Sequence, residues 1–328
     1  MKCLVTGATG SVGSRIVKRL LEEGHEVRAL SRTTSDLSLL NLDAIELVQG
    51  DMTDSDSLSR AVKGVDWVFH SAAPVDDWVS REVFWKVNVD GTRMLLEACR
   101  KQSLSRFVFL SSINVYGLHP KPNTNEESPY VGKHHPYCET KIEAEKMLLD
   151  AFEKERFPVT ILRPANIWGP TANAWTIRPV QRLLRNEVRL IDGGSGTINL
   201  IYVDNLADIC VRFAEMEETL GEGYIVTDGN REWHVKDFFD KYCEMLAIPP
   251  VTRSVPKPVA MGVALAAETY ARLTGNRPYI TRFVLQMLTK NCHYDVRKLQ
   301  SVYGKEPRYS FEEGMERTKK WLTDKGII

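Results

Sequence analysis

The sequence predicts an α/β fold in which a doubly wound parallel sheet is followed by a smaller, mostly helical domain. The first observation is that short apolar runs alternate with helical patterns over the first 165 residues. Strands that are apolar throughout belong to parallel sheets covered by helices on both faces. The second observation is that helical patterns dominate after residue 165. A chain of 328 residues, 43% hydrophobic and 26% charged, has the composition of a globular protein and the length for two such domains.

Each element is placed by the spacing of its apolar residues. The first half contains expected strands at residues 2–6, 26–30, 45–48, 66–69, 106–110 and 159–162, and expected helices at 14–23, 81–101 and 136–155. The second half contains expected strands at 198–203 and 223–226, and expected helices at 174–185, 204–217, 235–246, 257–273, 278–289 and 310–323. We expect residues 1–165 to form the sheet domain, with about 198–228 returning to it. Residues of about 166–197 and 229–328 would form the smaller domain.

Charge and cysteine spacing exclude several classes of protein. Forty-three basic residues balance forty-three acidic ones, so no global positive field is available to hold nucleic acid. The six cysteines form no CxxC pair, which argues against a zinc site or a disulfide framework and for reduced thiols in a cytoplasmic protein. A strand pattern begins at residue 2 in place of a signal peptide. The most apolar stretch, 259–267, has about half the length that a bilayer crossing requires.

A glycine-rich turn joins the first strand to the first helix. Its predicted phosphate-binding residues are Thr6, Gly7, Thr9, Gly10, Ser11, Val12 and Gly13. Gly7 permits a tight turn, Gly10 lets a pyrophosphate approach the backbone, and Gly13 allows the helix to pack closely on the sheet. Phosphates bind to the amide groups and the positive dipole of a helix N-terminus. Strand, turn and helix in this order predict a Rossmann domain that binds a dinucleotide.

The glycine spacing, GxxGxxG after a threonine, resembles the short-chain dehydrogenase/reductase superfamily, and the chain length resembles its extended branch. The resemblance implies that Asp51, followed by Met52, contacts the adenine amine. It implies that Pro164, after the sixth strand, lies beneath the nicotinamide. The small residues that would let the cofactor cross the sheet edge are Ser71, Ala72 and Ala73.

The end of the second strand predicts which nicotinamide cofactor is bound. A carboxylate there would bind the ribose hydroxyls of NAD and repel a 2′-phosphate. This strand ends in Ser31 and Arg32, and no carboxylate follows until Asp36. A guanidinium binds phosphate in a bidentate manner and stacks on adenine. Arg15, beside the glycine turn, offers a second cation. We therefore expect NADP(H) to be favoured over NAD(H).

A tyrosine and a lysine provide the candidate acid–base chemistry. Tyr137 and Lys141 lie four residues apart, so they share one face of the helix expected at 136–155. A nearby ammonium stabilises a phenolate and lowers the pKa of a tyrosine from its ordinary value near 10. The pair Ser111–Ser112 ends the fifth strand, at the edge where open parallel sheets bind ligands.

The resemblance assigns a role to each catalytic candidate. Ser112 would donate a hydrogen bond to the substrate oxygen, and Tyr137 would move the proton. Lys141 would tune Tyr137 and hold the nicotinamide ribose, and Asn88 would support the hydrogen-bond network of the site.

Two other motifs receive structural interpretations. His134 and His135 are adjacent, so they point in different directions, and no acidic or cysteine residue lies at ligand spacing. We interpret them as a loop pair ahead of Tyr137, at the substrate entrance, and we predict no metal site. Arg163 is interpreted as one half of a structural ion pair rather than as a catalytic residue.

The residues after the serine, and the second half of the chain, bear on the substrate. Dehydratases of the extended branch carry Asp-Glu where this chain has Ile113 and Asn114, so dehydration lacks its acid and base. The segments 255–266, 275–282, 294–298 and 309–314 resemble the 3β-hydroxysteroid dehydrogenase and sterol-4α-carboxylate dehydrogenase group, and more loosely dihydroflavonol reductases. The steroid enzymes usually carry Asp at the end of the second strand, so Ser31 departs from their pattern.

These observations predict an NADP(H)-dependent oxidoreductase that interconverts a secondary alcohol and a ketone on a hydrophobic, steroid-, flavonoid- or long-chain-like substrate. A nucleotide-sugar 4-epimerase and a non-catalytic cofactor-binding regulatory protein stay open as alternatives. We expect a small-molecule partner and no nucleic acid or transmembrane segment. A homodimer, and a weak contact of the stretch 259–267 with a membrane surface, also stay open.

Overall fold

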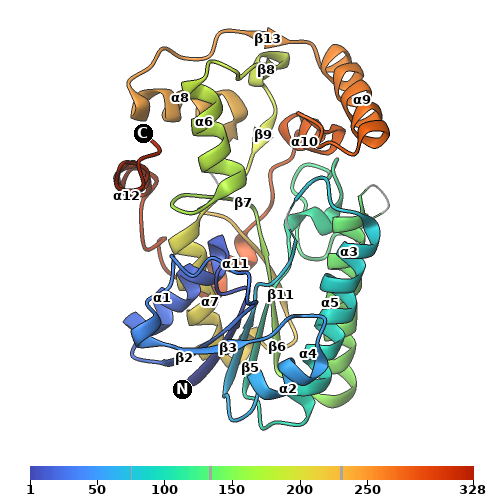
Figure 1. The fold of residues 1–328 in the computed structure, drawn as a ribbon, viewed down its shortest axis with the longest axis vertical. Helices are drawn as coiled ribbons and strands as arrows, with labels where there is room; N and C mark the ends of the chain where they lie inside the picture. The colour runs from blue at the N-terminus through green and yellow to red at the C-terminus, as the bar shows by residue number, and fades with distance from the viewer. Residues whose placement is uncertain (75, 133–134, 230–231) are drawn as a thin grey trace.

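The computed structural model describes residues 1–74, 76–132, 135–229 and 232–328. Its centre is a seven-stranded parallel sheet with the strand order β11-β6-β5-β4-β1-β2-β3 (Figure 1). The strands are β1 (Lys2–Thr6), β2 (Glu26–Ser31), β3 (Glu46–Gln49), β4 (Trp67–His70), β5 (Arg106–Leu110), β6 (Val159–Pro164) and β11 (Gly223–Val226). The order reverses direction at β1, as in a doubly wound fold, so the predicted fold class is confirmed.

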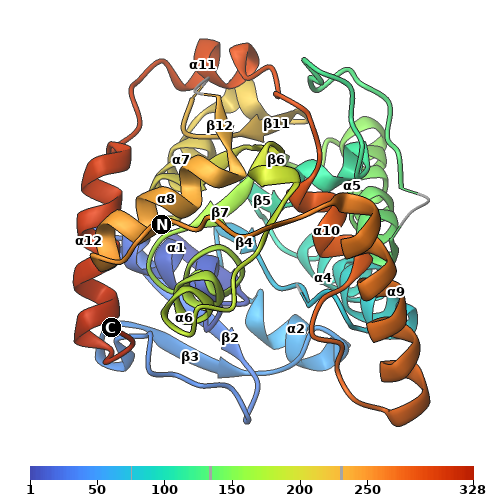
Figure 2. The ribbon, with the colours of Figure 1, turned by 90° about the horizontal axis from the view of Figure 1, so that it is seen from above.

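Helices cover both faces of the sheet. The flanking helices are α1 (Ser11–Glu22), α2 (Ser55–Ala61), α4 (Gly91–Arg100), α5 (Pro136–Glu155) and α7 (Val203–Glu215). Successive strand residues point to opposite faces. Cys3 and Val5 therefore pack in the core shared with α1 and α7, whereas Leu4 packs in the core shared with α2, α4 and α5. Figure 2 shows these two groups of helices on either side of the strands.

The smaller, mostly helical part lies above the carboxyl edge of the sheet (Figure 1). Its helices are α6 (Arg178–Leu184), α8 (Val235–Leu246), α9 (Lys257–Thr274), α10 (Arg282–Leu288) and α12 (Phe311–Asp324). Helix α11 (Arg297–Tyr303) packs instead against β11 and α7, in the core of the sheet domain. Three two-stranded sheets pair β7 (Asn166–Trp168) with β10 (Leu200–Tyr202), β9 (Thr197–Ile198) with β12 (Trp233–His234), and β8 (Leu190–Ile191) with β13 (Ser254–Val255). Across the described ranges, no helix is both long and apolar enough to span a bilayer. All six cysteines are buried and unpaired.

Several elements differ from the sequence prediction. The helix expected at 81–101 is interrupted, because α3 (Arg81–Trp85) and α4 are separated by the π-helical turn η2 (Lys86–Asp90). The short helices α2 and α11 were not predicted. α10 begins four residues later than expected, where the Thr281 side chain accepts a hydrogen bond from the Val284 amide and caps it. Single turns of other helix type are η1 (Leu42–Ala44), η3 (Ile113–Tyr116), η4 (Asn173–Ile177), η5 (Asp192–Gly194) and η6 (Glu217–Thr219).

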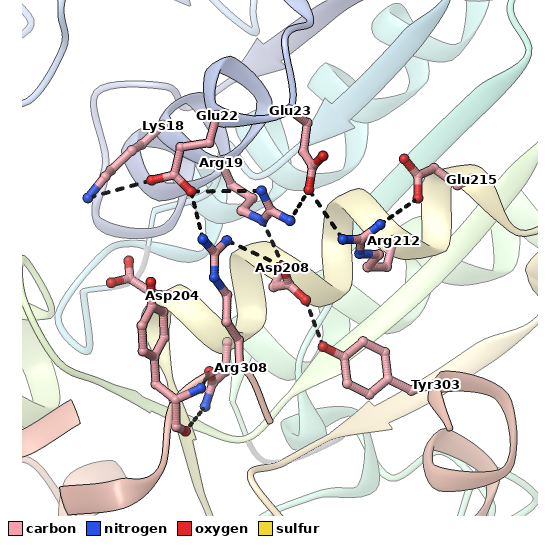
Figure 3. A network of polar contacts seen from close by, with 12 residues as sticks. Lys18, Arg19, Glu22, Glu23, Asp204, Asp208, Arg212, Glu215, Tyr303 and Arg308 are labelled. Carbon is pink, nitrogen blue, oxygen red and sulfur yellow. Dashed lines mark hydrogen bonds and ion pairs between the residues drawn. The ribbon is translucent and has the colours of Figure 1, made fainter. Parts of the chain in front are cut away.

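The C-terminal segment is tied back to the sheet domain by a charged network (Figure 3). Arg19 of α1 donates from Nε to Oδ1 of Asp208 in α7 at 2.7 Å. The Tyr303 hydroxyl donates to the other oxygen of Asp208 at 2.7 Å, and Arg308 lies 3.5 Å from the same carboxylate. The network therefore joins α1, α7 and the segment between α11 and α12.

Candidate active site

The glycine turn has the geometry that a dinucleotide phosphate requires. Gly7 has a φ of +68°, in the left-handed region. A Cβ at Gly13 would lie 2.1 Å from the Gly7 carbonyl oxygen, so only glycine permits this approach of α1 to the turn. No side chain within the described ranges caps the first amides of α1. Those amides have no intrahelical acceptor, so they are available to an anion, and the residues present fit a pyrophosphate.

Thr171 joins this turn to the segment after β7. Its hydroxyl donates to the Ser11 carbonyl at 3.1 Å and lies 3.2 Å from the Ser11 hydroxyl. Thr171 has a φ of +71°, which is uncommon for a β-branched residue. Thr9 and Val12 are half-buried in the turn and in the first turn of α1. Sequence reasoning missed Thr171 because a contact across 160 residues has no local signal.

At the expected adenosine end of the site, one cation is paired and another has no ion pair within the residues that the structure describes. Ser31 is buried and Arg32 is exposed at the end of β2. No ion pair of Arg32 occurs within the described part of the chain. Arg15 does not fulfil the expectation of a second free cation, because its Nε lies 3.4 Å from the Asp204 carboxylate of α7. This leaves Arg32 as the candidate for the 2′-phosphate.

The other predicted cofactor contacts lie along the carboxyl edge of the sheet. Asp51 Oδ1 accepts from the amide and hydroxyl of Thr53 at 2.8 and 2.7 Å, which fixes the carboxylate. Met52 is buried in the core beside α2, so its backbone rather than its side chain is left for a ligand.

The small residues after β4 approach the glycine turn closely. Ser71 donates to the Thr6 carbonyl at 2.8 Å, and a Cβ at Gly7 would lie 2.8 Å from the Cα of Ala72. Ala73 follows directly, half-buried. Pro164 is buried at the last position of β6, three strands away from β1 in the sheet.

The catalytic candidates come from two neighbouring elements. Ser112 follows β5 and caps η3, where its Oγ accepts from the Asn114 amide at 3.2 Å. Tyr137 lies in the first turn of α5, half-buried, and Lys141 lies one turn further at 3% exposure. The Tyr137 hydroxyl is hydrogen-bonded to Ser112. The structure therefore brings together the serine and tyrosine that the resemblance paired.

Burial dominates the electrostatics of Tyr137 and Lys141. Burial raises the pKa of Tyr137 to about 12, although the hydrogen bond to Ser112 acts in the opposite direction. Burial lowers the pKa of Lys141 to about 8, and the charge of Glu145 opposes that shift. The Nζ of Lys141 donates to the Leu110 carbonyl at 2.7 Å. Tyr137 is thus a protonated phenol at neutral pH.

Asn88 lies in the π-helical turn η2. Turns of this kind are frequent at functional sites. Its amide nitrogen donates to the Thr140 hydroxyl of α5 at 3.0 Å, and its carbonyl accepts from Thr92 at 2.6 Å. Its side-chain oxygen is buried and has no hydrogen-bond partner in the described part of the structure. Asn88 thereby links η2 to the helix that carries Tyr137 and Lys141.

His135 has a role that the sequence interpretation did not assign. Its Nδ1 accepts from the Tyr137 amide at 3.2 Å, so it caps α5, and Phe283 of α10 stacks on it with ring centroids 4.0 Å apart. Pro136 at the first helical position was the sequence signal for this cap. His134 lies outside the described residues. Of the residues that are described, no group of three His, Cys, Asp or Glu side chains could hold a metal ion.

A hollow of about 410 Å³ opens beside His135, between the start of α5 and helices α9 and α10. Trp78, Met261 and Phe283 supply apolar lining, whereas Asp77, Glu268, Arg272 and Arg282 supply charges of both signs.

The buried Arg163 forms the ion pair that the sequence predicted. Its guanidinium donates to Glu145 of α5 at 2.7 Å, and both side chains are at most 4% exposed.

Comparison with known proteins agrees with this geometry. The model of the NAD dependent epimerase/dehydratase family matches residues 3–227. The chain belongs to this family. A 2-alkyl-3-oxoalkanoate reductase from Stenotrophomonas maltophilia is 30% identical over 97% of this chain and 98% of its own length. A 3-beta-hydroxysteroid dehydrogenase from Mycolicibacterium neoaurum is 27% identical over 98% of this chain and 92% of its own.

Membership of the family identifies the protein as an NAD(P)-dependent enzyme of the extended short-chain dehydrogenase/reductase type. The reductase and steroid dehydrogenase relatives confirm the resemblance stated from the sequence. A solved structure of UDP-glucose 4-epimerase from Thermotoga maritima shares the fold, with a TM-score of 0.80 at 22% identity and 99% coverage of both chains.

Proposed function

We propose that this enzyme is an NADP(H)-dependent oxidoreductase that interconverts a secondary alcohol and a ketone on a hydrophobic substrate. The observation that carries the proposal is the Ser112–Tyr137 hydrogen bond at the carboxyl edge of the sheet, with Lys141 one turn along α5. Ile113 and Asn114 follow Ser112, so the carboxylate pair that dehydration needs is replaced by an apolar and an amide side chain.

The protonation state of Tyr137 suits ketone reduction. Its phenol, with a pKa raised to about 12 by burial, holds a proton that it can give to the carbonyl oxygen. Ser112 donates a hydrogen bond to the same oxygen and stabilises the charge that develops there. A nicotinamide, when bound, supplies the hydride that the carbonyl carbon accepts. Lys141 would hold the nicotinamide ribose and favour return of a proton to Tyr137.

The cofactor preference rests on the end of β2. Arg32 is exposed and free of a carboxylate within the described ranges, and Ser31 offers a hydroxyl in place of the NAD-binding carboxylate. In the 410 Å³ hollow beside His135, the side chains of Trp78, Met261 and Phe283 offer apolar contacts to such a substrate, next to charged side chains. It also agrees with the names of the two relatives, which denote reductases or dehydrogenases of alkanoates and steroids.

A nucleotide-sugar 4-epimerase is the second candidate, favoured by the shared fold of UDP-glucose 4-epimerase and by the same serine–tyrosine pair. The fate of the hydride separates the two. An epimerase returns it to the substrate and leaves the cofactor unchanged, whereas a dehydrogenase changes NADPH in step with product.

The test is an assay of a 2-alkyl-3-oxoalkanoate, a 3-oxosteroid and UDP-glucose with each cofactor, followed by NADPH absorbance and product analysis. Stoichiometric consumption of NADPH with a ketone is expected. Catalytic turnover of UDP-glucose without net change of cofactor would contradict the proposal and support the epimerase function.

A further inference from the structure

Helix α9 leaves an apolar face exposed to solvent. The side chains of this outer face follow one another at intervals of three and four residues, so they share one side of the helix. They are Val259, Val263, Ala266, Tyr270 and Leu273, all of them exposed, with Leu273 at 82%. An amphipathic helix normally buries its apolar side, so this face is one that a partner would cover.

The opposite side of α9 holds the helix to the protein. Ala260 and Ala264 pack with Leu285 of α10. The Glu268 carboxylate accepts from the Arg282 amide at 2.7 Å and from its guanidinium at 2.8 Å. The same side of α9 borders the 410 Å³ hollow at the start of α5. The outer face is therefore not needed to hold α9 in place.

The outer face belongs to a wider gathering of exposed apolar side chains. Twelve large apolar side chains are exposed in the described part of the chain, and seven of them belong to α6, α9 or the loop after α9. Those seven are Leu184, Val259, Val263, Leu265, Tyr270, Leu273 and Tyr279. α6 lies against that loop, because the Arg182 guanidinium donates to the Tyr279 carbonyl at 3.0 Å. Exposed apolar surface gathered in this way marks contact with a protein or a membrane.

The surface around the N-terminus of α9 is basic, although the whole chain is neutral. Residues 178–192 and 251–282 together hold nine basic residues and three acidic ones. Arg189 and Arg253 lie beside each other, since they precede the paired strands β8 and β13. Both are exposed, and neither forms an ion pair with another described residue. Lys257, the first residue of α9, adds a third cation there.

The other end of α9 also carries a cation without a carboxylate. Arg272 is exposed and stacks over Trp78, at 5.8 Å from the guanidinium to the ring centroid, and it has no ion pair among the residues described. Arg277 is paired with Asp76 and Asp77, so its charge is balanced. A basic rim of Arg189, Arg253, Lys257 and Arg272 therefore borders the outer face at both of its ends.

The basic rim decides between the two occupants that an apolar face could take. A second copy of the chain would bring one basic rim against another, and like charges oppose association. An anionic lipid surface is complementary to both parts. Helices that lie in a membrane interface bury their apolar side at the boundary of headgroups and acyl chains, and lysine and arginine bind the anionic headgroups.

We propose that α9 binds the protein to the surface of an anionic lipid bilayer, with the outer face in the interface and the basic rim on the lipid phosphates. The helix lies on the bilayer and does not cross it, in agreement with its length and hydropathy. This binding is independent of the proposed alcohol–ketone chemistry. Because the inner side of α9 borders the hollow, the bound protein would hold that hollow next to the lipid.

The test is flotation of the full chain with vesicles of phosphatidylglycerol and phosphatidylcholine in equal parts, and with vesicles of phosphatidylcholine alone. Val263→Gln combined with Leu273→Gln should lower the partition coefficient on the anionic vesicles by at least about tenfold, because two apolar side chains no longer enter the interface. Leu42→Gln combined with Leu47→Gln, at two exposed leucines of η1 and β3, should leave it unchanged.

The basic rim is tested on the same vesicles. Arg189→Gln combined with Arg253→Gln should weaken anionic binding by about tenfold or more, and added salt should weaken the binding of the wild type. A wild type that binds neither kind of vesicle, or both equally, overturns the proposal. A dimer that forms without vesicle binding and is lost in the Val263→Gln, Leu273→Gln variant overturns it in favour of a second copy.

A label on the outer face gives a readout that does not depend on weakening the binding. The six native cysteines are buried, so a thiol-reactive, environment-sensitive dye modifies chiefly the new thiol of Leu273→Cys. Anionic vesicles should shift the emission of this dye to the blue and should leave the same dye on Leu42→Cys unshifted. The melting temperature of each variant checks its folding. Equal shifts at the two positions, or none at either, contradict binding through α9.

Discussion

Arg163 and Lys290 are both buried cations, but their surroundings differ. The Arg163 guanidinium donates from Nε to both oxygens of Glu145, at 3.1 and 3.0 Å. Its Nη1 donates to the Tyr116 hydroxyl at 2.7 Å and its Nη2 to the Tyr130 hydroxyl at 2.9 Å. Lys290, buried to the same degree, has none of these contacts among the residues described.

The difference separates a buried charge that the protein itself pairs from one that the described residues leave without a hydrogen bond. A guanidinium whose donors are matched by a carboxylate and two hydroxyls has nothing left to offer a substrate. A buried ammonium without acceptors has no attraction to offset the cost of removing its charge from water. The same distinction applies at the cofactor end, where Arg15 is paired with Asp204 and Arg32 has no ion pair among the described residues. Four measurements test this division.

The largest effect is expected at the matched pair. Glu145→Ala leaves Arg163 buried without its carboxylate, and breaking such a pair typically costs about 3–5 kcal/mol of stability. Urea unfolding gives the free energy directly. Glu155→Ala is the control, because it removes the partner of Arg100 in a pair that is largely exposed, where the expected cost is about 1 kcal/mol or less. Similar losses of unfolding free energy in the two variants would show that the buried pair contributes no more to stability than the exposed one.

The catalytic hydroxyl should affect rate and not stability. Tyr137→Phe removes only the proton donor, so turnover should fall by at least about 10²-fold while NADPH still binds and the unfolding free energy changes little. Steady-state kinetics of ketone reduction give the turnover, and calorimetry gives the affinity for NADPH. Tyr270→Phe, at a side chain 64% exposed on α9, is the matched control. Unchanged turnover in Tyr137→Phe would remove this residue from the mechanism.

The cofactor preference should follow the free arginine and not the paired one. A charge-assisted contact from Arg32 to the 2′-phosphate should contribute about 1.5–3 kcal/mol, or roughly 10- to 150-fold in affinity for NADPH over NADH. Ser31→Asp combined with Arg32→Ala should reverse the preference, because it adds repulsion as well as removing attraction.

Arg15→Ala is the control for that measurement, and it should leave the ratio of the two affinities unchanged. Both cofactors are titrated calorimetrically at one ionic strength, since salt weakens an exposed phosphate contact. Equal binding of NADH and NADPH by the wild type would mean that Arg32 has no role in the preference.

The smallest effect is a pH dependence of stability. The folded pKa of Lys290, about 8, lies below the ordinary lysine value near 10.4, so the unfolded chain holds this proton more tightly. The penalty is fully present below about pH 8 and is relieved as the pH rises to about 10.4. Lys290→Met should therefore raise the free energy of unfolding at pH 7, by less than the pKa shift alone implies because the contacts of the lysine side chain are lost, and this advantage should disappear by pH 10. Lys146→Met should show no such trend.

The regular part of the fold was predictable because its signals are local. Apolar runs placed all seven strands of the sheet to within about two residues, and the glycine turn fixed the first helix. The helix expected at 81–101 was predicted as continuous because a π-helical turn adds one residue without changing the apolar pattern. The short helix α2 was missed, although Asp54, whose side chain accepts from the Asp56 amide, is a capping residue at its start.

The residues of the candidate site that belong to a family motif could be predicted from the sequence. The residues that tertiary contacts bring to it could not. Tyr137, Lys141 and Ser112 follow from spacing and resemblance. The sequence around Lys290 does not show that its ammonium is buried, because Cys138, which interacts with it, comes from the distant helix α5. The same holds for Arg15, whose partner in α7 lies far along the chain.

The six buried thiols can report local opening of the folded protein. Burial raises the pKa of Cys3 and of Cys138 to about 12, so almost none of the reactive thiolate exists in the folded state. An alkylating reagent can therefore modify a cysteine only while its surroundings are transiently open. Cys138 lies in α5, Cys210 in α7 and Cys243 in α8. The alkylation rates at these three positions, followed by mass spectrometry, report how often the surroundings of each cysteine open. One experiment on the unmodified chain therefore compares local opening in the catalytic helix, on the opposite face of the sheet and in the helical domain.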